Sequence, residues 1–225
     1  MQAVSTKPAY VNSAVMAIDP MVAVMKKVVT NEEIDYIIKT ATDKVKRSRV
    51  SADTESITSD HRTGSNCWLY YEKDVVAKKI GERIANIVGI PLSHAEAMQV
   101  VHYAPGQEYR PHHDAYNLNT PRGQRCCAKG GQRLVTALVY LNEVEEGGGT
   151  TFPKLNITIN PTPGRLLLFH NTGEDVTKAH PDSLHAGTPV IKGEKWAFTI
   201  WFHQYPLSYK PFEMPQNKVE TKVTT

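Results

Sequence analysis

The chain has 225 residues, of which 40% are hydrophobic and 22% are charged. This balance provides enough apolar side chains for a buried core and excludes a wholly disordered protein. Lysine and arginine number 26 against 23 acidic residues, and the small excess of +3 is scattered along the chain, so no nucleic-acid partner is expected. The longest apolar runs fall far short of the ~20 residues that cross a membrane, so no membrane association is expected either.

The cysteines and the first residues indicate a reducing compartment. Cys67, Cys126 and Cys127 are odd in number and two of them are adjacent, which suits a disulfide framework poorly. The opening residues, Met1 to Thr6, lack the features of a signal peptide. We therefore expect a cytoplasmic protein. The pattern makes no prediction of its oligomeric state.

The length is compatible with a single domain over residues 1–225. Within it we expect a folded core at about 22–206, preceded by an N-terminal arm at 1–21 and followed by a polar C-terminal tail at 207–225. The arm carries no clear periodicity and leads into a strand at 22–29.

Two helices are expected next. A capping box begins at Thr30, and apolar residues at helical spacing continue from there to a basic cluster at 44–47. A second helix begins near Asp74 and ends at Gly89. Between the helices, residues 49–65 are polar and rich in turn formers, so we expect a long exposed loop.

From residue 97 to 205 the pattern changes to successive strands separated by Gly, Pro and Asn clusters. The main strands are expected at Met98–Tyr103, Leu134–Asn142, Gly164–His170 and Lys195–Phe202. Helices followed by a run of strands predict an α+β protein whose strands form a sandwich or barrel, rather than a βαβ alternation.

A His-x-Asp pair at His112 and Asp114 is the most informative motif. Side chains alternate along an extended chain, so these two point to the same side while His113 points away. Two such ligands and one further histidine make the 2-His-1-carboxylate triad that binds non-haem iron. His185 is the preferred third ligand, because its segment could pair beside the first ligand strand.

Other histidines are weaker candidates for the third ligand. His170 ends an apolar strand and His180 lies in a polar loop, while His94 and His102 belong to no evident pattern. Taken alone, a His-x-Asp pair is also compatible with a histidine held by a carboxylate for structural reasons.

The last strand adds a second feature. Its even-numbered residues from Trp196 to Phe202 are apolar, so Lys195 and Thr199 lie on the opposite face and point into the sandwich. A buried lysine needs an anion. That anion is either a carboxylate of the protein or a bound dicarboxylate, to which Thr199 would donate a second hydrogen bond.

The motifs in this order resemble the Fe(II)- and 2-oxoglutarate-dependent prolyl 4-hydroxylases, over roughly residues 29–206. The matching positions are Tyr103, Tyr109, His112, Asp114, Gly130-Gly131-Gln132-Arg133, Tyr140, Glu146-Gly147-Gly148-Gly149-Thr150, His185, Lys195, Thr199 and Trp201. The resemblance implies a double-stranded β-helix (jelly-roll or cupin-like) core with N-terminal helices packed outside.

The resemblance also implies a site and its cofactors. His112, Asp114 and His185 would bind Fe(II), and Lys195 would pair with the distal carboxylate of 2-oxoglutarate as the fourth catalytic residue. Tyr103, Tyr140, Thr150 and Thr199 would line the same pocket. The implied reaction consumes O2 and 2-oxoglutarate, releases succinate and CO2, and hydroxylates proline at C4, with ascorbate as a possible reductant.

The implied partner is a proline-containing peptide or protein. Its expected contacts are Arg62, Trp68, Tyr109, Arg133, Trp201 and His203. Gly64 stands where relatives have serine, which is a departure from the family pattern in the Arg62 segment. Two alternatives stay open from the sequence: the same chemistry on another side chain or a small molecule, and a non-catalytic binding module on this scaffold.

Overall fold

The computed structural model describes residues 10, 12–51 and 56–208. Its α-helices are α1 (Asn31–Thr42), α2 (Val75–Val88) and α3 (Pro121–Cys127), and its 3-10 helices are η1 (Leu92–His94) and η2 (Pro181–Ser183). The strands are β1 (Ala14–Ile18), β2 (Met21–Met25), β3 (Lys46–Arg47), β4 (Arg49–Ser51), β5 (Ser56–Thr58), β6 (Ser65–Leu69), β7 (Met98–Tyr103), β8 (Tyr109–His112), β9 (Arg133–Tyr140), β10 (Glu146–Gly147), β11 (Thr150–Phe152), β12 (Ile157–Ile159), β13 (Leu166–His170), β14 (His185–Gly187), β15 (Val190–Lys192) and β16 (Lys195–His203).

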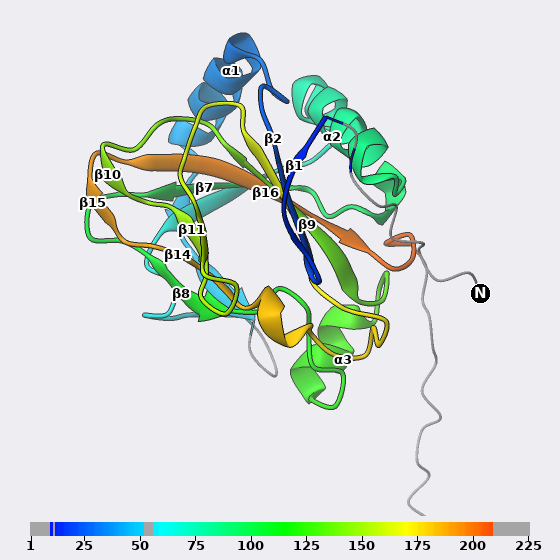
Figure 1. Cartoon of the computed structure of the whole chain (residues 1–225). Coiled ribbons are helices and arrows are strands. Elements are labelled where there is room, and N and C mark those ends of the chain that lie inside the picture. Colours follow the sequence, from blue (N-terminus) through cyan, green and yellow to red (C-terminus); the bar gives the residue numbers. More distant parts are fainter. Residues whose placement is uncertain (1–9, 11, 52–55, 209–225) are drawn as a thin grey trace, which may run out of the picture.

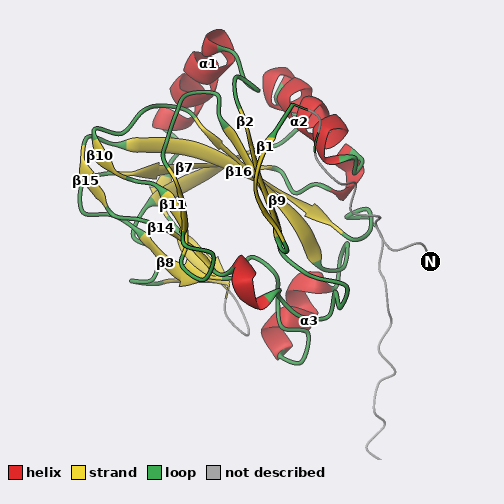
Figure 2. Cartoon of the chain, viewed as in Figure 1, coloured by secondary structure: helices red, strands yellow, loops and turns green. Residues whose placement is uncertain are grey.

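The larger sheet has the strand order β1-β2-β13-β9-β16-β7-β6-β3, and its paired strands are antiparallel. Its central strand is β16, which is buried along its whole length. The apolar face predicted for this strand is confirmed, because Trp196, Phe198, Ile200 and Phe202 belong to one core with the buried sides of α1 and α2. Figures 1 and 2 show both helices lying over this side of the sheet.

The opposite face of the larger sheet meets a smaller sheet. That sheet has the order β12-β11-β14-β8, and β10 pairs with β15 beside it. A second core fills the space between the sheets, with Phe169 of β13 packed edge-on against Phe152 of β11. Two facing antiparallel sheets with helices outside one of them confirm the expected α+β, double-stranded β-helix class.

The helix limits follow the local signals, with one correction. α1 has the capping box at Thr30, and α2 is capped by Asp74 and ends at Gly89 in the left-handed region. However, α1 ends at Thr42 and does not reach the basic cluster at 44–47. Lys46 and Arg47 instead form β3, which pairs with β6 at the end of the larger sheet. Strand pairing has overridden the helical periodicity there.

Two segments expected to be irregular contain strands. The expected N-terminal arm includes β1, which pairs with β2 and extends the larger sheet before residue 22. The expected loop at 49–65 contains the β4–β5 hairpin. Residues 1–9 and 11 of the arm, 52–55 of the loop and 209–225 of the tail lie outside the described residues.

No α-helix within the described residues is long and apolar enough to cross a membrane.

Candidate active site

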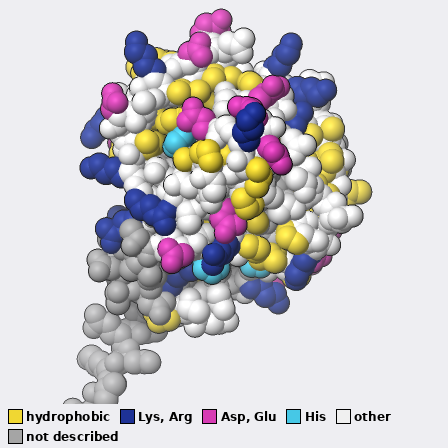
Figure 3. Space-filling view, turned by 90° about the vertical axis from the view of Figure 1, so that its left-hand side faces the viewer, with side chains coloured by type: hydrophobic (Ala, Val, Ile, Leu, Met, Phe, Trp, Pro, Cys, Tyr) yellow, Lys and Arg dark blue, Asp and Glu magenta, His cyan; other side chains and the backbone are white. Residues whose placement is uncertain are grey.

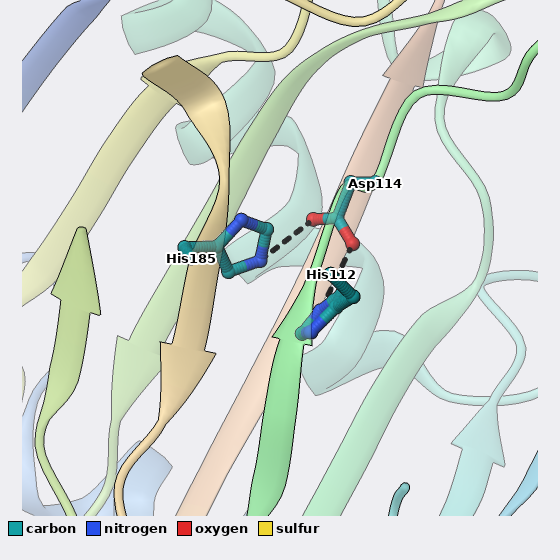
Figure 4. A group of neighbouring side chains, drawn as sticks. All are labelled: His112, Asp114 and His185. Atoms are coloured by element: carbon teal, nitrogen blue, oxygen red, sulfur yellow. Dashed lines mark ion pairs between the residues drawn. The ribbon is translucent and has the colours of Figure 1, made fainter. Parts of the chain in front are cut away.

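The smaller sheet brings the two predicted histidine ligands together. β8 and β14 are antiparallel neighbours, and His112 is directly opposite His185 in their register. Asp114 follows β8 two residues beyond His112 and turns back toward both rings (Figure 4). One ligand atom from each of the three side chains lies within 4.8 Å of the others. This is the only such group of His, Cys, Asp or Glu side chains among the described residues.

Backbone carbonyls orient both imidazoles. His112 Nδ1 lies 2.8 Å from the carbonyl oxygen of Arg110, and His185 Nδ1 lies 2.9 Å from that of Ser183. A carbonyl only accepts, so each Nδ1 carries the proton and donates it, which leaves each Nε2 as the atom with a lone pair. Both Nε2 atoms are 3.6 Å from a carboxylate oxygen of Asp114.

Hydrogen bonds from neighbouring side chains also fix the position of Asp114. The Thr136 hydroxyl donates to Asp114 Oδ2 at 2.7 Å, and the amide of Asn171 donates to Thr136 Oγ1 at 2.9 Å. All three side chains are buried. Nothing in the sequence pattern marks Thr136 or Asn171 as site residues, because they reach Asp114 only when β9 and the end of β13 pack beneath it.

The protonation states suit a cation. Burial alone would raise the pKa of Asp114, but the imidazoles of His185 and His112 outweigh burial and hold it below its usual range. Burial, followed by the nearby His112, lowers the pKa of His185 to about 4. At neutral pH the site therefore contains a carboxylate and a neutral imidazole at His185, which are the ligand forms that a divalent metal requires.

The other histidines lie in different surroundings. His113 is not part of the cluster, and its Nδ1 lies 3.2 Å from the Ser183 hydroxyl. His170 contacts the Tyr10 hydroxyl at 3.0 Å, and His180 lies 3.2 Å from Asp19. His94 contacts a backbone carbonyl and His102 contacts Glu194. The structure thus places His185, and neither His170 nor His180, beside His112 and Asp114.

A small cavity of about 50 Å³ adjoins the cluster. It is lined by the cluster residues together with Tyr103, Thr150, Lys195 and Thr199 among others. Lys195 is 4% exposed, and no carboxylate of the described residues lies within 4.0 Å of its ammonium group. Burial lowers the pKa of Lys195 to about 8. Of the two anions considered from the sequence, the protein carboxylate is therefore absent among the described residues.

Tyr140 supports this cavity from the side. Its hydroxyl donates to Thr150 Oγ1 at 2.7 Å and lies 3.1 Å from the carbonyl oxygen of Ile159. Its ring centroid is 5.4 Å from Lys195 Nζ. Tyr140 therefore orients Thr150 and has its ring beside the Lys195 ammonium group, while Thr150 is the residue of the two that lines the cavity.

A much larger groove of about 800 Å³ opens beside the cavity. Asp114, Arg62, Tyr109 and Trp201 border both spaces, so the groove leads to the metal cluster. Every residue that the sequence suggested as a substrate contact lines it, namely Arg62, Trp68, Tyr109, Arg133, Trp201 and His203. Trp68 and Trp201 are neighbours there, with ring centroids 6.2 Å apart and ring planes tilted by 45°.

Glu96 binds two of these residues, Arg133 and His203, and no sequence motif marks it as a site residue. The Arg133 guanidinium donates to both carboxylate oxygens of Glu96, at 2.6 and 2.9 Å, and His203 Nε2 lies 2.8 Å from one of them. Arg133 also lies 4.0 Å from the centroid of the Trp201 ring. Glu96 stands between η1 and β7 in no recognisable motif, so only the folded chain reveals the pair.

Gly64 is explained by close packing against Tyr103. A Cβ atom at this position would lie 2.5 Å from the Tyr103 ring and 2.8 Å from the carbonyl oxygen of His102. A serine would therefore displace the ring that lines the cavity, or the backbone of β7. Arg62 nearby donates to Gln99 at 2.8 Å and lies 4.9 Å from the Tyr109 ring centroid.

The fold and this donor set define the class of mononuclear non-haem iron oxygenases built on a double-stranded β-helix. Comparison with known proteins gives the same class: residues 98–203 match the family model of the 2OG-Fe(II) oxygenase superfamily.

Relatives narrow the class further. The chain is 36% identical over 212 residues to "probable prolyl 4-hydroxylase 3" of Arabidopsis thaliana, covering 84% of this chain and 71% of that protein. It is 34% identical to prolyl 4-hydroxylase 5 of the same plant, covering 84% and 70%. The structure of viral collagen prolyl hydroxylase from Paramecium bursaria Chlorella virus-1, in its 2OG complex, superposes with a TM-score of 0.64 and 28% identity, over 80% of this chain and 94% of that one. The protein belongs to the prolyl 4-hydroxylase family of 2-oxoglutarate- and Fe(II)-dependent dioxygenases.

Proposed function

We propose that this protein hydroxylates proline residues at C4 within a peptide or protein substrate. The observation that carries the proposal is a buried lysine, Lys195, which has no carboxylate of the described residues beside it and lies in a cavity that adjoins the three-residue metal cluster. This arrangement fits a metal ion and a small dicarboxylate side by side, which are the two components that a 2-oxoglutarate dioxygenase needs.

His112, Asp114 and His185 are proposed to bind Fe(II). Their neutral and anionic donor atoms fit the metal, and the hydrogen bonds from the two Nδ1 atoms and from Thr136 hold the donors in place. When bound, Fe(II) together with 2-oxoglutarate and O2 supplies the oxidising chemistry, which yields succinate, CO2 and a hydroxylated substrate.

Lys195 and Thr199 are proposed to bind the distal carboxylate of 2-oxoglutarate. Both belong to β16, two pleats apart on the face that lines the cavity. Tyr103 and Thr150 line the same space, and Tyr140 holds Thr150. These residues bury the co-substrate away from water, which strengthens the pairing of Lys195 with its carboxylate.

The groove is proposed to bind the polypeptide. The aromatic rings of Tyr109, Trp201 and Trp68 offer flat surfaces on which a proline ring can pack, while Arg133 and His203 are held by Glu96 along the same wall. An open groove of this size suits a chain better than a small molecule.

The test is hydroxylation of proline-rich peptides by the purified protein with Fe(II), 2-oxoglutarate and O2. Succinate release should depend on the peptide, and mass spectrometry should find one added oxygen on proline, with 4-hydroxyproline identified after hydrolysis. Lys195→Met is the matched negative control. If succinate release responds to small molecules and to no proline peptide, the proposed substrate is wrong.

Two further points belong to the proposal. Ascorbate is a candidate reductant, to be tested by whether repeated turnover declines without it. A reducing compartment such as the cytoplasm suits the three cysteines, none of which forms a disulfide.

A further inference from the structure

The groove beside the metal cluster is strongly basic. Of its lining residues, eight are lysine or arginine and only two are acidic. The acidic pair is already engaged, since Asp114 belongs to the metal cluster and Glu96 binds Arg133 and His203. The whole chain carries a net charge of only +3, so positive charge is concentrated in this groove rather than spread evenly.

The exposed cations form two rims from distant parts of the chain. One rim contains Lys44, Lys46, Arg47 and Arg49, from the segment that runs from the end of α1 to the first residue of β4. The other contains Arg122 and Lys129, at the two ends of α3. All six are exposed.

Most of these cations are not neutralised by the protein. Among the described residues, no carboxylate lies within 4.0 Å of Lys44, Lys46, Arg122 or Lys129. Arg47 donates to backbone carbonyls of Thr63 and Ser59, and its one carboxylate neighbour among the described residues is the exposed Asp60, at 4.0 Å. On the face drawn in Figure 3, several basic side chains lie along the left edge, and several acidic ones lie over the middle.

We propose that the substrate carries anionic side chains on both sides of the target proline, which the two basic rims of the groove attract. This proposal rests on the proposed function and specifies its substrate class. A concave surface with charge of one sign focuses the field and raises the local concentration and association rate of an oppositely charged ligand. The aromatic rings of Tyr109, Trp201 and Trp68 contact the proline, and the two basic rims contribute selectivity through charge.

The experiment compares peptides that differ only in charge. One proline peptide is made with glutamate, phosphoserine, glutamine or lysine at the flanking positions, and kcat/KM is measured at roughly 0.02 M and 0.2 M salt, across which the range of electrostatic attraction shortens more than twofold. At low salt the glutamate peptide should exceed the glutamine peptide by about tenfold or more, and the lysine peptide should be poorest. The advantage should shrink at higher salt. The phosphoserine arm shows whether carboxylate or phosphate is preferred.

Variants locate the effect. Two double variants, Lys44→Glu/Lys46→Glu and Arg122→Glu/Lys129→Glu, each reverse the charge of one rim. Each should bring the kcat/KM for the glutamate peptide, divided by that for the glutamine peptide, toward one. Lys26→Glu/Lys39→Glu is the matched control, because both lysines are exposed, lie outside the groove and change the net charge equally. Its ratio should equal that of the unaltered protein.

Binding of the same labelled peptides, measured by fluorescence anisotropy, is independent of turnover. If all peptides are hydroxylated equally well, the inference is wrong and the proposed function stands. If none is hydroxylated but the glutamate peptide still binds in a rim-dependent way, the inference stands and the proposed reaction fails. If a single-stranded oligonucleotide binds more tightly than either anionic peptide, the groove serves a polynucleotide and the inference is overturned.

Discussion

At the scale of single residues, the direction of each ligand side chain decides its role. His112 and His113 are neighbours, yet only His112 lies within reach of Asp114 and His185. We predict that His112→Ala lowers iron affinity more than about 100-fold, because only two ligands remain. The loss of a residue that merely orients a ligand costs up to roughly 100-fold. Iron titration of succinate release checks this, with His113→Ala as the adjacent control. Equal loss in both variants would contradict the assignment.

A second prediction concerns Thr136, whose hydroxyl donates to Asp114. We predict that Thr136→Val lowers iron affinity by about 10–100-fold, because the hydroxyl that orients Asp114 Oδ2 is removed while the shape of the side chain is kept. The control is Thr158→Val, an exposed threonine on β12 whose hydroxyl donates to Thr151 Oγ1. Unchanged affinity in the Thr136 variant, measured by competition with a chelator, would mean that the backbone alone orients Asp114.

Lys195 gives a prediction that depends on pH. Burial lowers its pKa to about 8, and only the protonated form attracts a carboxylate. The value of kcat/KM for 2-oxoglutarate should therefore fall about tenfold for each pH unit above 8, with little dependence on Lys195 below it. Lys195→Arg should abolish this decline because the guanidinium stays charged.

The variant that removes the charge of this side chain is Lys195→Met. It should weaken 2-oxoglutarate use by roughly 3–5 kcal/mol below pH 8, since a buried carboxylate is left unpaired, and by progressively less above pH 8, where Lys195 itself loses its charge. An alkaline decline that persists in this variant would assign the titration to another group.

At the scale of elements, Glu96 lies just before β7 and connects this segment to β9 through Arg133 and to β16 through His203. Although burial would raise the pKa of Glu96, Arg133 and His203 lower it to about 2. The folded-state pKa lies below the unfolded value of about 4.5, so the carboxylate stabilises the fold above pH 4.5 and this stabilisation is lost as the pH falls from about 4.5 to 2.

We predict that Glu96→Gln costs about 3–5 kcal/mol at neutral pH, because a buried guanidinium loses its anion. The variant should also lose part of the acid sensitivity between pH 4.5 and 2 that the unaltered protein shows in urea unfolding. Glu82→Gln, on the exposed side of α2, is the control. A cost below about 1 kcal/mol would show that the pair behaves like a surface ion pair.

At the scale of the whole molecule, the two faces of the larger sheet have separate roles. The outer face packs on α1 and α2, while the inner face carries Lys195 and Thr199 and borders the site. We predict that Ile84→Ala, which empties a fully buried position on α2, costs about 2–5 kcal/mol of stability. Iron and 2-oxoglutarate affinities should stay unchanged well below the melting temperature.

Val75→Ala, on the same helix but 83% exposed, should alter neither stability nor affinity by a measurable amount. If Ile84→Ala also weakens the binding of iron, the helical layer and the site are coupled through the sheet.

Local sequence was sufficient for several elements. The capping box at Thr30 and the glycine stop at Gly89 depend on neighbouring residues only, so α1 begins and α2 ends where they indicate. The alternation in β16 depends on one strand and its two faces, so Lys195 and Thr199 were predictable as inward-facing residues. The grouping of His112, Asp114 and His185 was predictable from the order of motifs.

Only the tertiary structure decided the rest. The end of α1 depends on the pairing of β3 with β6, and the partners of Asp114 and Arg133 lie 22 and 37 residues away along the chain. The basic rims combine residues near 46 with residues near 125, which no local pattern connects. These features arise because long-range strand pairing and side-chain packing bring distant residues together, and the free energy of such contacts is a property of the folded chain rather than of any segment.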